Sequence, residues 1–409
     1  MTALSFSSAR LEINRRSRQV YATLAKDGYG TLLDRTRQKI SDWIRPQRYD
    51  WPVFPEDVVK ADLMRGPSAP VRRIEENEPI AINWVTGPAS AGSGGHTTIA
   101  RMIEYLQAKG HINRLYLYDP YSADQKYYED ILRKHFGITC EIGNVRTGMV
   151  DAHAVIATNW PSAYAVFNAR SAGRRFYFVQ DYEPYFYPTG TASVLAENTY
   201  RMGFHGITAG PWLAEKLSHE FGMETSSFPF GCDVAHYRRL PNARRSGVAF
   251  YARQSTPRRA VELGFLALEI FANRNPNIDL HLFGQDIAGL PFRFINHGTV
   301  TPAKLNEIYN QCIAGLSLSL TNTSLVPHEM LAAGCIPVVN DDQKNHAVLN
   351  NPHIRYASLA PHALAAEIEA IVTMPGREAA SIQAAESVAF TSWSAAGAAV
   401  EAALYAALR

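Results

Sequence analysis

The sequence of 409 residues predicts an α/β protein in which two Rossmann-like domains face a central cleft. From residue 79 onward, short apolar segments alternate with segments of helical character, which is the pattern of parallel sheets covered on both faces. The polar stretch 241–247 interrupts this pattern once, and a second series follows it. The length suffices for two domains of ordinary size. Because ligands bind outside the carboxyl ends of parallel strands, tandem domains of this kind predict a cleft between those ends.

The first Rossmann-like domain is predicted at 76–242 and the second at 243–390, with a final helical segment at 391–409. In the first domain we expect strands at 80–85, 114–118, 154–158 and 175–179, and helices at 97–108, 121–136, 162–172, 192–202 and 211–221. In the second we expect strands at 248–251, 278–283, 292–295, 316–320 and 336–339, and helices at 258–273 and 302–311. The last helix, rich in alanine, is predicted at 392–408.

Residues 1–75 form a separate N-terminal extension and linker. Apolar residues at helical spacing predict a helix over 16–43, and a proline-rich stretch after it predicts an irregular linker. Arginines and lysines crowd the first 50 residues. We favour a packing extension, and the alternative is a basic surface that makes peripheral contact with anionic lipid at the inner face of the membrane.

The overall composition narrows the class of protein. The balance of 46% hydrophobic and 19% charged residues is that of a globular chain, and a net charge of +2 gives no general reason to expect a nucleic-acid partner. No apolar run is long enough to span a bilayer, and no secretory signal is visible. The four cysteines are scattered, which argues against a zinc site or a disulfide framework and predicts a cytoplasmic location.

The most informative segment is 317–340, which reads as a polar loop, a short helix and a buried strand. Thr321, Thr323 and Ser324 supply hydroxyls and backbone N–H groups just before the helix. Such a loop, at the carboxyl end of a strand, is where open α/β sheets bind phosphorylated ligands. Glu329 would repel a phosphate, so a sugar or ribose hydroxyl is its expected partner. The alternative is an ordinary crossover with a solvated glutamate.

A glycine-rich loop follows the first predicted strand. Gly92, Gly94 and Gly95 allow the backbone to approach a ligand closely before the next helix begins. Their spacing matches neither the dinucleotide motif nor the P-loop, so NAD and ATP are not expected. The alternative is a flexible turn without a ligand.

The second domain opens with a cationic segment. Arg253 directly follows a predicted strand, and Arg258 lies at the start of the next helix. Together with helix N–H groups, these cations would match a diphosphate. The alternative is that the arginines cover the surface, and for Arg259 we expect that outcome.

An aromatic and acidic segment, 179–188, joins another predicted strand to the cleft edge. Rings and carboxylates together commonly hold sugars, because apolar ring faces stack and carboxylates accept hydroxyl protons. A packed tyrosine cluster is the alternative. No Ser-His-Asp arrangement with a known spacing is visible, and no paired-carboxylate hydrolase site is apparent.

Taken in order over 79–409, these motifs resemble the GT-B glycosyltransferases of the large retaining family that includes sucrose and polysaccharide synthases (GT4-like). The matching motifs are Gly94-Gly95, Arg253 with Arg258, the turn at 230–233, the helix at 329–334 and the strand at 337–339. The segments 180–188, 199–204 and 206–213 are similar, more narrowly, to the WsaF group of rhamnosyltransferases.

The resemblance implies transfer of a sugar, L-rhamnose from dTDP-β-L-rhamnose, to a growing polysaccharide or lipid-linked glycan. It implies a donor site on the second domain, an acceptor site on the first, a last helix that crosses back to the first domain, and no metal or other cofactor. The implied donor-binding residues are Gly94, Gly95, Arg253, Arg258, Thr321, Thr323, Ser324 and Glu329. The implied acceptor-binding residues are His96, Gln180, Asp181, Tyr182 and Glu183. The implied catalytic residues are Asp181, Glu183, Arg253 and Glu329.

One position departs from the family. Its signature has two glutamates, and Glu329 matches the second, but Thr321 occupies the place of the first. A threonine can hydrogen-bond a sugar hydroxyl but carries no negative charge. Either that charge is dispensable, or another carboxylate such as Asp181 or Glu183 supplies it. Two other classes therefore remain open: a non-catalytic glycan-binding or scaffold protein, and a nucleotide-sugar epimerase with the same fold.

Overall fold

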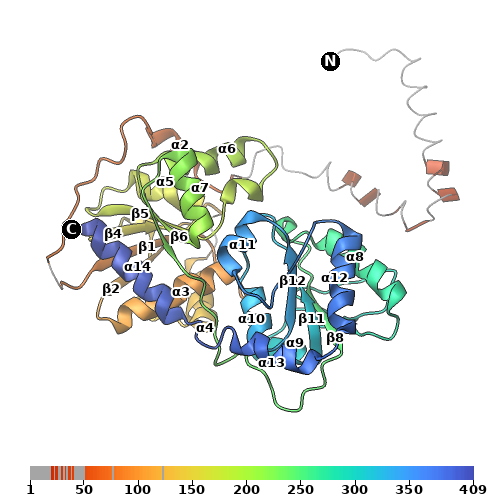
Figure 1. The fold of residues 1–409 in the computed structure, drawn as a ribbon. Coiled ribbons are helices and arrows are strands. Elements are labelled where there is room, and N and C mark those ends of the chain that lie inside the picture. The colour runs from red at the N-terminus through yellow and green to blue at the C-terminus, as the bar shows by residue number, and fades with distance from the viewer. Residues whose placement is uncertain are drawn as a thin grey trace, which may run out of the picture. The chain divides into compact units, whose positions relative to one another are not determined.

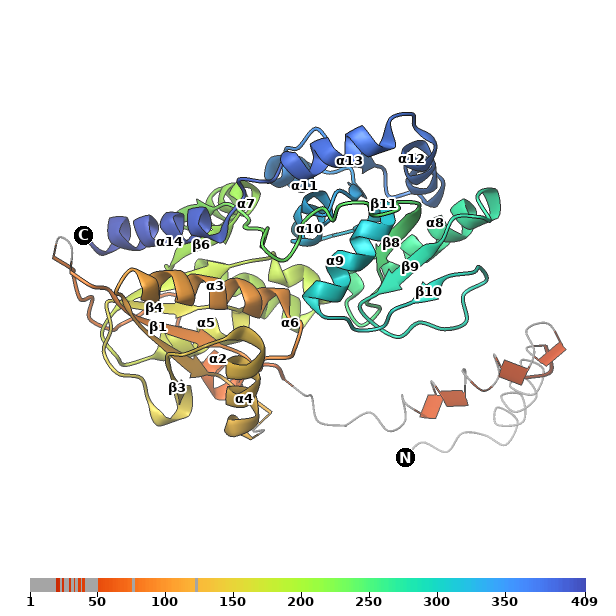
Figure 2. The same cartoon turned by 90° about the horizontal axis from the view of Figure 1, so that it is seen from below.

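The computed structural model describes residues 51–75, 78–121 and 124–409, with scattered helical positions between 20 and 40. The chain divides into two units, Met1–Pro52 and Val53–Arg409. In the first unit, Val20, Leu24, Leu33 and Ile40 are helical and substantially exposed. The predicted helix 16–43 lies largely outside the described residues, and so does most of the basic surface that was considered for lipid contact. The second unit contains two parallel sheets (Figures 1 and 2).

The first sheet has seven parallel strands in the order β3-β2-β1-β4-β5-β6-β7. Its strands are β1 (Ala81–Thr86), β2 (Ile112–Leu117), β3 (Glu141–Asn144), β4 (Ala154–Ala157), β5 (Arg174–Val179), β6 (His205–Ala209) and β7 (Thr225–Phe228). Its helices are α3 (Gly94–Ala108), α4 (Gln125–Phe136), α5 (Trp160–Asn168), α6 (Thr191–Asn198) and α7 (Pro211–Phe221). Every residue of β4 and β6 is buried, as expected for strands covered on both faces.

The segment after residue 52, expected within the linker, packs on the first sheet domain. Helix α2 (Pro55–Lys60) contacts α5. The hydroxyl of Tyr118 donates to Asp57 at 2.9 Å, and the Tyr118 ring meets Phe54 edge to face at 5.3 Å. These contacts tie the segment to the carboxyl end of β2.

The second sheet has six parallel strands in the order β10-β9-β8-β11-β12-β13. Its strands are β8 (Gly247–Tyr251), β9 (Leu280–Phe283), β10 (Ile295–Asn296), β11 (Cys312–Leu316), β12 (Ile336–Asn340) and β13 (Arg355–Ala357). Its helices are α8 (Val261–Arg274), α9 (Pro302–Gln311), α10 (Val326–Ala332), α11 (Gln343–Leu349), α12 (Pro361–Thr373) and α13 (Arg377–Glu386).

Several expected elements have different limits, and the strand expected at 292–295 begins only at Ile295. The strand expected at 316–320 ends at Leu316, and Leu320 is 40% exposed in the loop that follows. The helix expected from 258 begins at Val261, because Ala260 has a positive φ of 47° that separates it from the 3₁₀ helix Pro257–Arg259. The helix expected at 192–202 ends at Asn198 and continues as a 3₁₀ turn.

The final helix, α14 (Trp393–Leu408), lies against α3 and β7 of the first domain (Figures 1 and 2). Gly397 permits this approach, since a Cβ there would lie 2.2 Å from the Tyr105 ring. Nε2 of His111 lies 2.9 Å from Glu401. The chain thus returns from the second domain to the first, which confirms the expected crossing.

Both sheets change strand order next to their first strand. In the first sheet the change falls between β1 and β4, and in the second between β8 and β11. Such switch points are where doubly wound sheets bind ligands. The glycine-rich loop leaves β1, the cationic segment leaves β8, and the polar loop 317–325 leaves β11. The fold therefore places all three sequence motifs at the positions that bind ligands in such sheets.

Candidate active site

The loop after β11 reaches across to the first domain. The buried Asn322 side chain donates to the backbone carbonyls of Gln180, at 2.8 Å, and Ala209, at 3.2 Å. These carbonyls follow and end the neighbouring strands β5 and β6, respectively. Asn322 therefore joins the two domains through one side chain.

The cationic segment makes a second connection between the domains. Nε of Arg258 lies 3.5 Å from Oδ2 of Asp181, and its guanidinium lies 4.2 Å from the centre of the Phe186 ring. The backbone N–H of Leu320 donates to the carbonyl of Arg258 at 2.9 Å. Three segments far apart in sequence, 180–186, 253–259 and 317–325, thus meet in one place.

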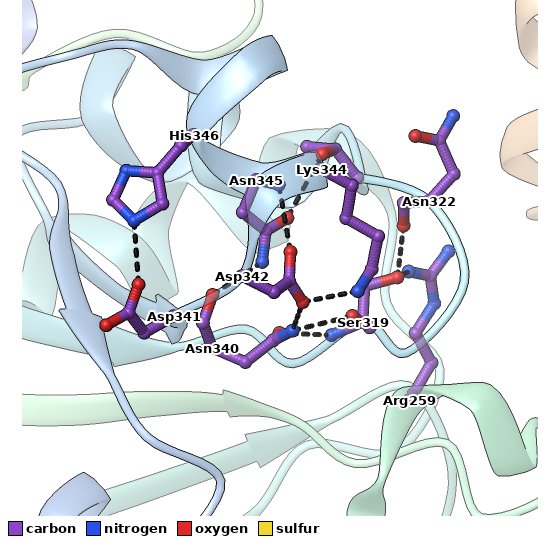
Figure 3. Close-up of polar contacts among 10 residues, drawn as sticks. Arg259, Ser319, Asn322, Asn340, Asp341, Asp342, Lys344, Asn345 and His346 are labelled. Atoms are coloured by element: carbon purple, nitrogen blue, oxygen red, sulfur yellow. Dashed lines mark hydrogen bonds and ion pairs between the residues drawn. The ribbon is translucent and has the colours of Figure 1, made fainter. Parts of the chain in front are cut away.

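Arg259 does not cover the surface, and that expectation was wrong. The half-buried Arg259 donates to the Ser319 hydroxyl at 2.7 Å (Figure 3). Burial lowers the pKa of Arg259, and the nearby Asp181 carboxylate partly offsets that effect. The positive φ of Ala260 turns the chain just after Arg259, so that this arginine lies beside the loop rather than on an exposed helix face.

A network of amides and hydroxyls fixes the loop after β11 to the end of β12 (Figure 3). Asn340 exchanges two hydrogen bonds of 2.9 Å with the backbone of Ser319. The amide of Asn345, at the start of α11, donates to the carbonyl of Asn340 at 2.8 Å and accepts from Thr323 at 3.0 Å. Since these groups satisfy one another, the loop is held in a defined shape before any ligand arrives.

Asp181 lies where this loop meets the first domain. Burial raises the pKa of the Asp181 carboxyl, while Arg258, Arg259 and the Thr321 hydroxyl each lower it. Thr321 is 1% exposed, and its hydroxyl makes no hydrogen bond of normal geometry among the described residues. The Asp181 carboxyl group beside Thr321 thus comes from the other domain.

Glu183 and Tyr182 lie deeper in the first domain. Glu183 is 5% exposed and accepts from the first backbone N–H of α5, on Trp160, at 2.7 Å. Burial raises the pKa of Glu183 to about 8. The Tyr182 ring is buried and stacks on Tyr200 with a separation of 5.6 Å. Neither side chain faces open solvent, and both hold the segment that carries Asp181.

The glycine loop lies beside the same segment. Ser93 caps α3, and its hydroxyl lies 2.9 Å from Nδ1 of His96. Nε2 of His96 lies 3.3 Å from the Thr86 hydroxyl, and burial lowers the pKa of its ring. A Cβ on Gly95 would lie 3.6 Å from the Gln180 side chain, whereas Gly94 has open space around it.

Glu329 and Arg253 belong to the second domain. Glu329 is in the first turn of α10, and burial raises its pKa to about 7, against a lowering effect of Tyr309. Arg253, two residues after β8, is half-buried and has no ion pair or side-chain hydrogen bond among the described residues. Ser324 accepts from the N–H of Val326 at 3.2 Å, within the turn that starts α10.

The sequence reasoning counted Asn322 as an amide of the polar loop without giving it a role between the domains, and it missed Asn340 and Asn345. Each is buried and bonded to backbone carbonyls, so each orders the loop rather than offering a charge. A signal was present only for Asn340, because an asparagine that ends an apolar strand must find buried partners. In the part of the chain that the structure describes, no group of three or more His, Cys, Asp or Glu residues is placed to hold a metal ion. Within the same residues, no helix is long and apolar enough to cross a membrane.

Two parallel-sheet domains that face each other, with a last helix returning to the first, define the GT-B fold. Comparisons with known proteins agree with this fold. Residues 246–369 match the family described as "WsaF, C-terminal domain". The O-antigen biosynthesis protein RfbC of Myxococcus xanthus is 35% identical over 250 residues, which cover 59% of this chain and 20% of that protein. The chain thus spans well under half the length of this relative.

Two solved structures share the fold. Sucrose-phosphate synthase from Thermosynechococcus elongatus superposes with a TM-score of 0.59 at 14% identity, covering 80% of this chain and 99% of that one. A variant of S. aureus TarM, in complex with UDP, α-GlcNAc-glycerol and fondaparinux, gives a TM-score of 0.65 at 8% identity, covering 80% and 99%. At such low identity these similarities establish the architecture alone.

Proposed function

We propose that this protein is a retaining glycosyltransferase that moves a sugar from a nucleotide-sugar donor to a glycan acceptor in polysaccharide biosynthesis. The donor we propose is dTDP-β-L-rhamnose, and the acceptor is a growing or lipid-linked glycan. The observation that carries the proposal is the meeting of three segments, 180–186, 253–259 and 317–325, at the carboxyl ends of two facing sheets. The similarity to an O-antigen biosynthesis protein supports the substrate class.

The donor's diphosphate would lie at the switch point of the second sheet. Arg253 has no protein partner among the described residues, and Arg258 lies next to the polar loop. As the bond to the sugar breaks, negative charge grows on the diphosphate, and preorganised cations and N–H groups stabilise it. No metal is needed in this scheme, since the arginines supply the positive charge. Glu329 would accept a hydrogen bond from a ribose or sugar hydroxyl.

The acceptor would approach from the first domain. Gly94 has open space around it and Gly95 lies beside Gln180, so the backbone there can come close to a sugar. Asp181 is the carboxylate at the junction of the domains, and it would orient or deprotonate the acceptor hydroxyl. Glu183 is held inside by Trp160, so its proposed contribution is to position Asp181.

Asp181 could also replace the glutamate that the family signature has at the position of Thr321. The Thr321 hydroxyl is buried next to the Asp181 carboxyl group, so an acidic side chain lies at that point. It comes from the first domain instead of from the loop. We infer that the charge expected from the family signature is supplied across the cleft.

A panel of nucleotide sugars tests the proposal. The full chain is incubated with each donor, with and without a glycan acceptor, and released nucleotide diphosphate and product are measured. We expect release of dTDP from dTDP-rhamnose that depends on the acceptor, and retained anomeric configuration in the product by NMR. Absence of release with every donor would refute an enzyme and favour a scaffold protein. Interconversion of the free donor without an acceptor would identify an epimerase instead.

A further inference from the structure

Two histidines hold the amino end of the central strand of the first sheet. His111 directly precedes β2 and His153 directly precedes β4, and these two strands lie on either side of β1. The backbone N–H of Ile80 donates to Nδ1 of His111 at 3.1 Å, and the N–H of Ala81 donates to Nδ1 of His153 at 2.9 Å. Both side chains are buried. We call this pair of histidines the β1 clasp, and it lies at the end of the sheet opposite to the loops of the candidate active site.

These two hydrogen bonds fix the protonation state of both rings. A backbone N–H group can only donate, so each Nδ1 must be an acceptor without a proton, and the proton of the neutral ring lies on Nε2. In an imidazolium both ring nitrogens are donors. A proton added to Nδ1 would therefore face the proton of the backbone N–H group, and the hydrogen bond would be lost. Each bond of the β1 clasp thus requires a neutral ring.

The other nitrogen of His111 faces a carboxyl group of the last helix. Nε2 of His111 lies 2.9 Å from Oε1 of Glu401 on α14, and the Tyr105 hydroxyl on α3 donates to the other oxygen of that group at 3.3 Å. The Tyr405 ring meets the His111 ring edge to face at 5.8 Å. Lys109 lies over the Tyr105 ring at 5.6 Å. Because Glu401 can accept from a neutral ring and from an imidazolium alike, protonation would cost His111 its backbone bond and leave the contact with α14 in place.

The other nitrogen of His153 faces the chain that enters β1. Nε2 of His153 makes no hydrogen bond of normal geometry within the described part of the chain, and Oε1 of Glu78 lies 3.4 Å from it. A guanidinium nitrogen of Arg72 lies 3.8 Å from the same oxygen. Burial lowers the pKa of His153, Arg72 lowers it further, and Glu78 partly offsets both effects. The carbonyl of Glu78 accepts from the Tyr405 hydroxyl at 3.1 Å, so the entering chain is also held by α14.

We propose that the β1 clasp is a pH-sensitive attachment, which holds the backbone of Ile80 and Ala81 while both rings are neutral and releases it when either ring takes up a proton. A released N–H group would be buried without an acceptor, which is costly, so segment 78–81 must open to water. The open form binds protons that the closed form excludes. Opening therefore becomes more favourable as the pH falls below about 6.5, the ordinary pKa of histidine. This inference does not depend on the proposed sugar transfer.

Amide hydrogen exchange of the full chain tests the proposal. Exchange of the Ile80 and Ala81 amides is measured at about pH 5.5 and about pH 7.5 and corrected for the pH dependence of exchange in an unfolded peptide. In the double variant His111→Asn/His153→Asn, each Oδ1 takes the place of Nδ1 and accepts at any pH in this range. The exposed His135→Asn on α4 is the matched control. Nitrogen-15 NMR of the histidine rings of the wild type identifies the protonated nitrogen directly, whether or not the double variant folds.

We expect the two amides of the wild type to exchange at least about tenfold faster at the lower pH, because a ring that must be neutral in the closed form favours opening about tenfold per pH unit below its ordinary pKa. His135→Asn should behave like the wild type, and the double variant should change less than about twofold. At neutral pH both rings should carry their proton on Nε2. A proton on Nδ1 of His111 or His153 would overturn the proposal. The same pH dependence of exchange in the wild type and the double variant would also overturn it, because the two rings would then not control the opening.

Discussion

Replacing Glu183 by glutamine should make the stability of the protein less dependent on pH. The carboxyl group is buried, which raises its pKa to about 8 from an ordinary value of 4.5. Between these values the folded chain keeps a proton that the unfolded chain has lost. The free energy of unfolding therefore falls as pH rises through this window. At about 1.4 kcal/mol per pH unit, the window corresponds to about 5 kcal/mol, of which about 3 kcal/mol falls between pH 6 and pH 8.

The assay is urea unfolding of both chains at about pH 6 and about pH 9. The wild type should lose about 2–3 kcal/mol more than Glu183→Gln over this range. A glutamine can still accept from the N–H of Trp160, which Glu183 now does at 2.7 Å, so the fold should persist. Glu220→Gln, at a half-exposed surface glutamate, is the matched control and should follow the wild type. Equal pH dependence in the wild type and Glu183→Gln would refute the reasoning, since the carboxyl group would then not titrate differently on folding.

Three further predictions concern the candidate active site and the last helix. Arg253→Ala should lower kcat/KM for transfer by about 10²–10³, as loss of a preorganised charge at the leaving group does, whereas the exposed Arg293→Ala should leave turnover unchanged in the same kinetic assay. Asp181→Asn should also slow transfer. Adding Thr321→Glu to this variant should restore part of the rate in the same assay. If the double variant is no faster than Asp181→Asn, the two side chains do not share one role. Gly397→Ala should lower stability by about 1–3 kcal/mol in urea, since its methyl group would lie 2.2 Å from a tyrosine ring. At a helix position without that contact, the same change would stabilise by about 1 kcal/mol.

The fold class could be predicted because it depends on periodicity and order along the chain. Helices α7 and α9 have the expected limits, since prolines at their first positions mark where each begins. Strands β3, β6, β7 and β13 were not predicted. β3 and β7 have few buried residues, and β6 begins with His205-Gly206, which does not read as a strand without its neighbours. Their pairing is decided by the sheet, which supplies contacts that no local window contains.

The place of the candidate site in the fold was predictable where a charge or a glycine marks it. Arg258, Asp181 and the polar loop after β11 were singled out from sequence, and the structure brings them together. Arg259 was misplaced, because the positive φ of Ala260 has no signal in an alanine residue. Glu183 was given an acceptor role because it lies in the aromatic and acidic segment 179–188 and because the family resemblance implies that role. Burial and the bond to Trp160 depend on tertiary packing, and no spacing along the chain reveals them.

In the proposed scheme, charge balance at the junction of the domains would account for the three arginines of segment 253–259. Segment 253–259 carries three positive charges, and the carboxylate that it meets across the cleft is Asp181. Arg259 also hydrogen-bonds the loop through Ser319, so its charge is fixed in place. One carboxylate balances one arginine, which would leave two positive charges for the two negative charges of the proposed donor's diphosphate. A glutamate at 321 in addition to Asp181 would remove one of these charges. Either Asp181 or a glutamate at 321 would keep the positive and negative charges equal. Both together would weaken binding of the proposed donor, and Thr321 therefore goes with Asp181.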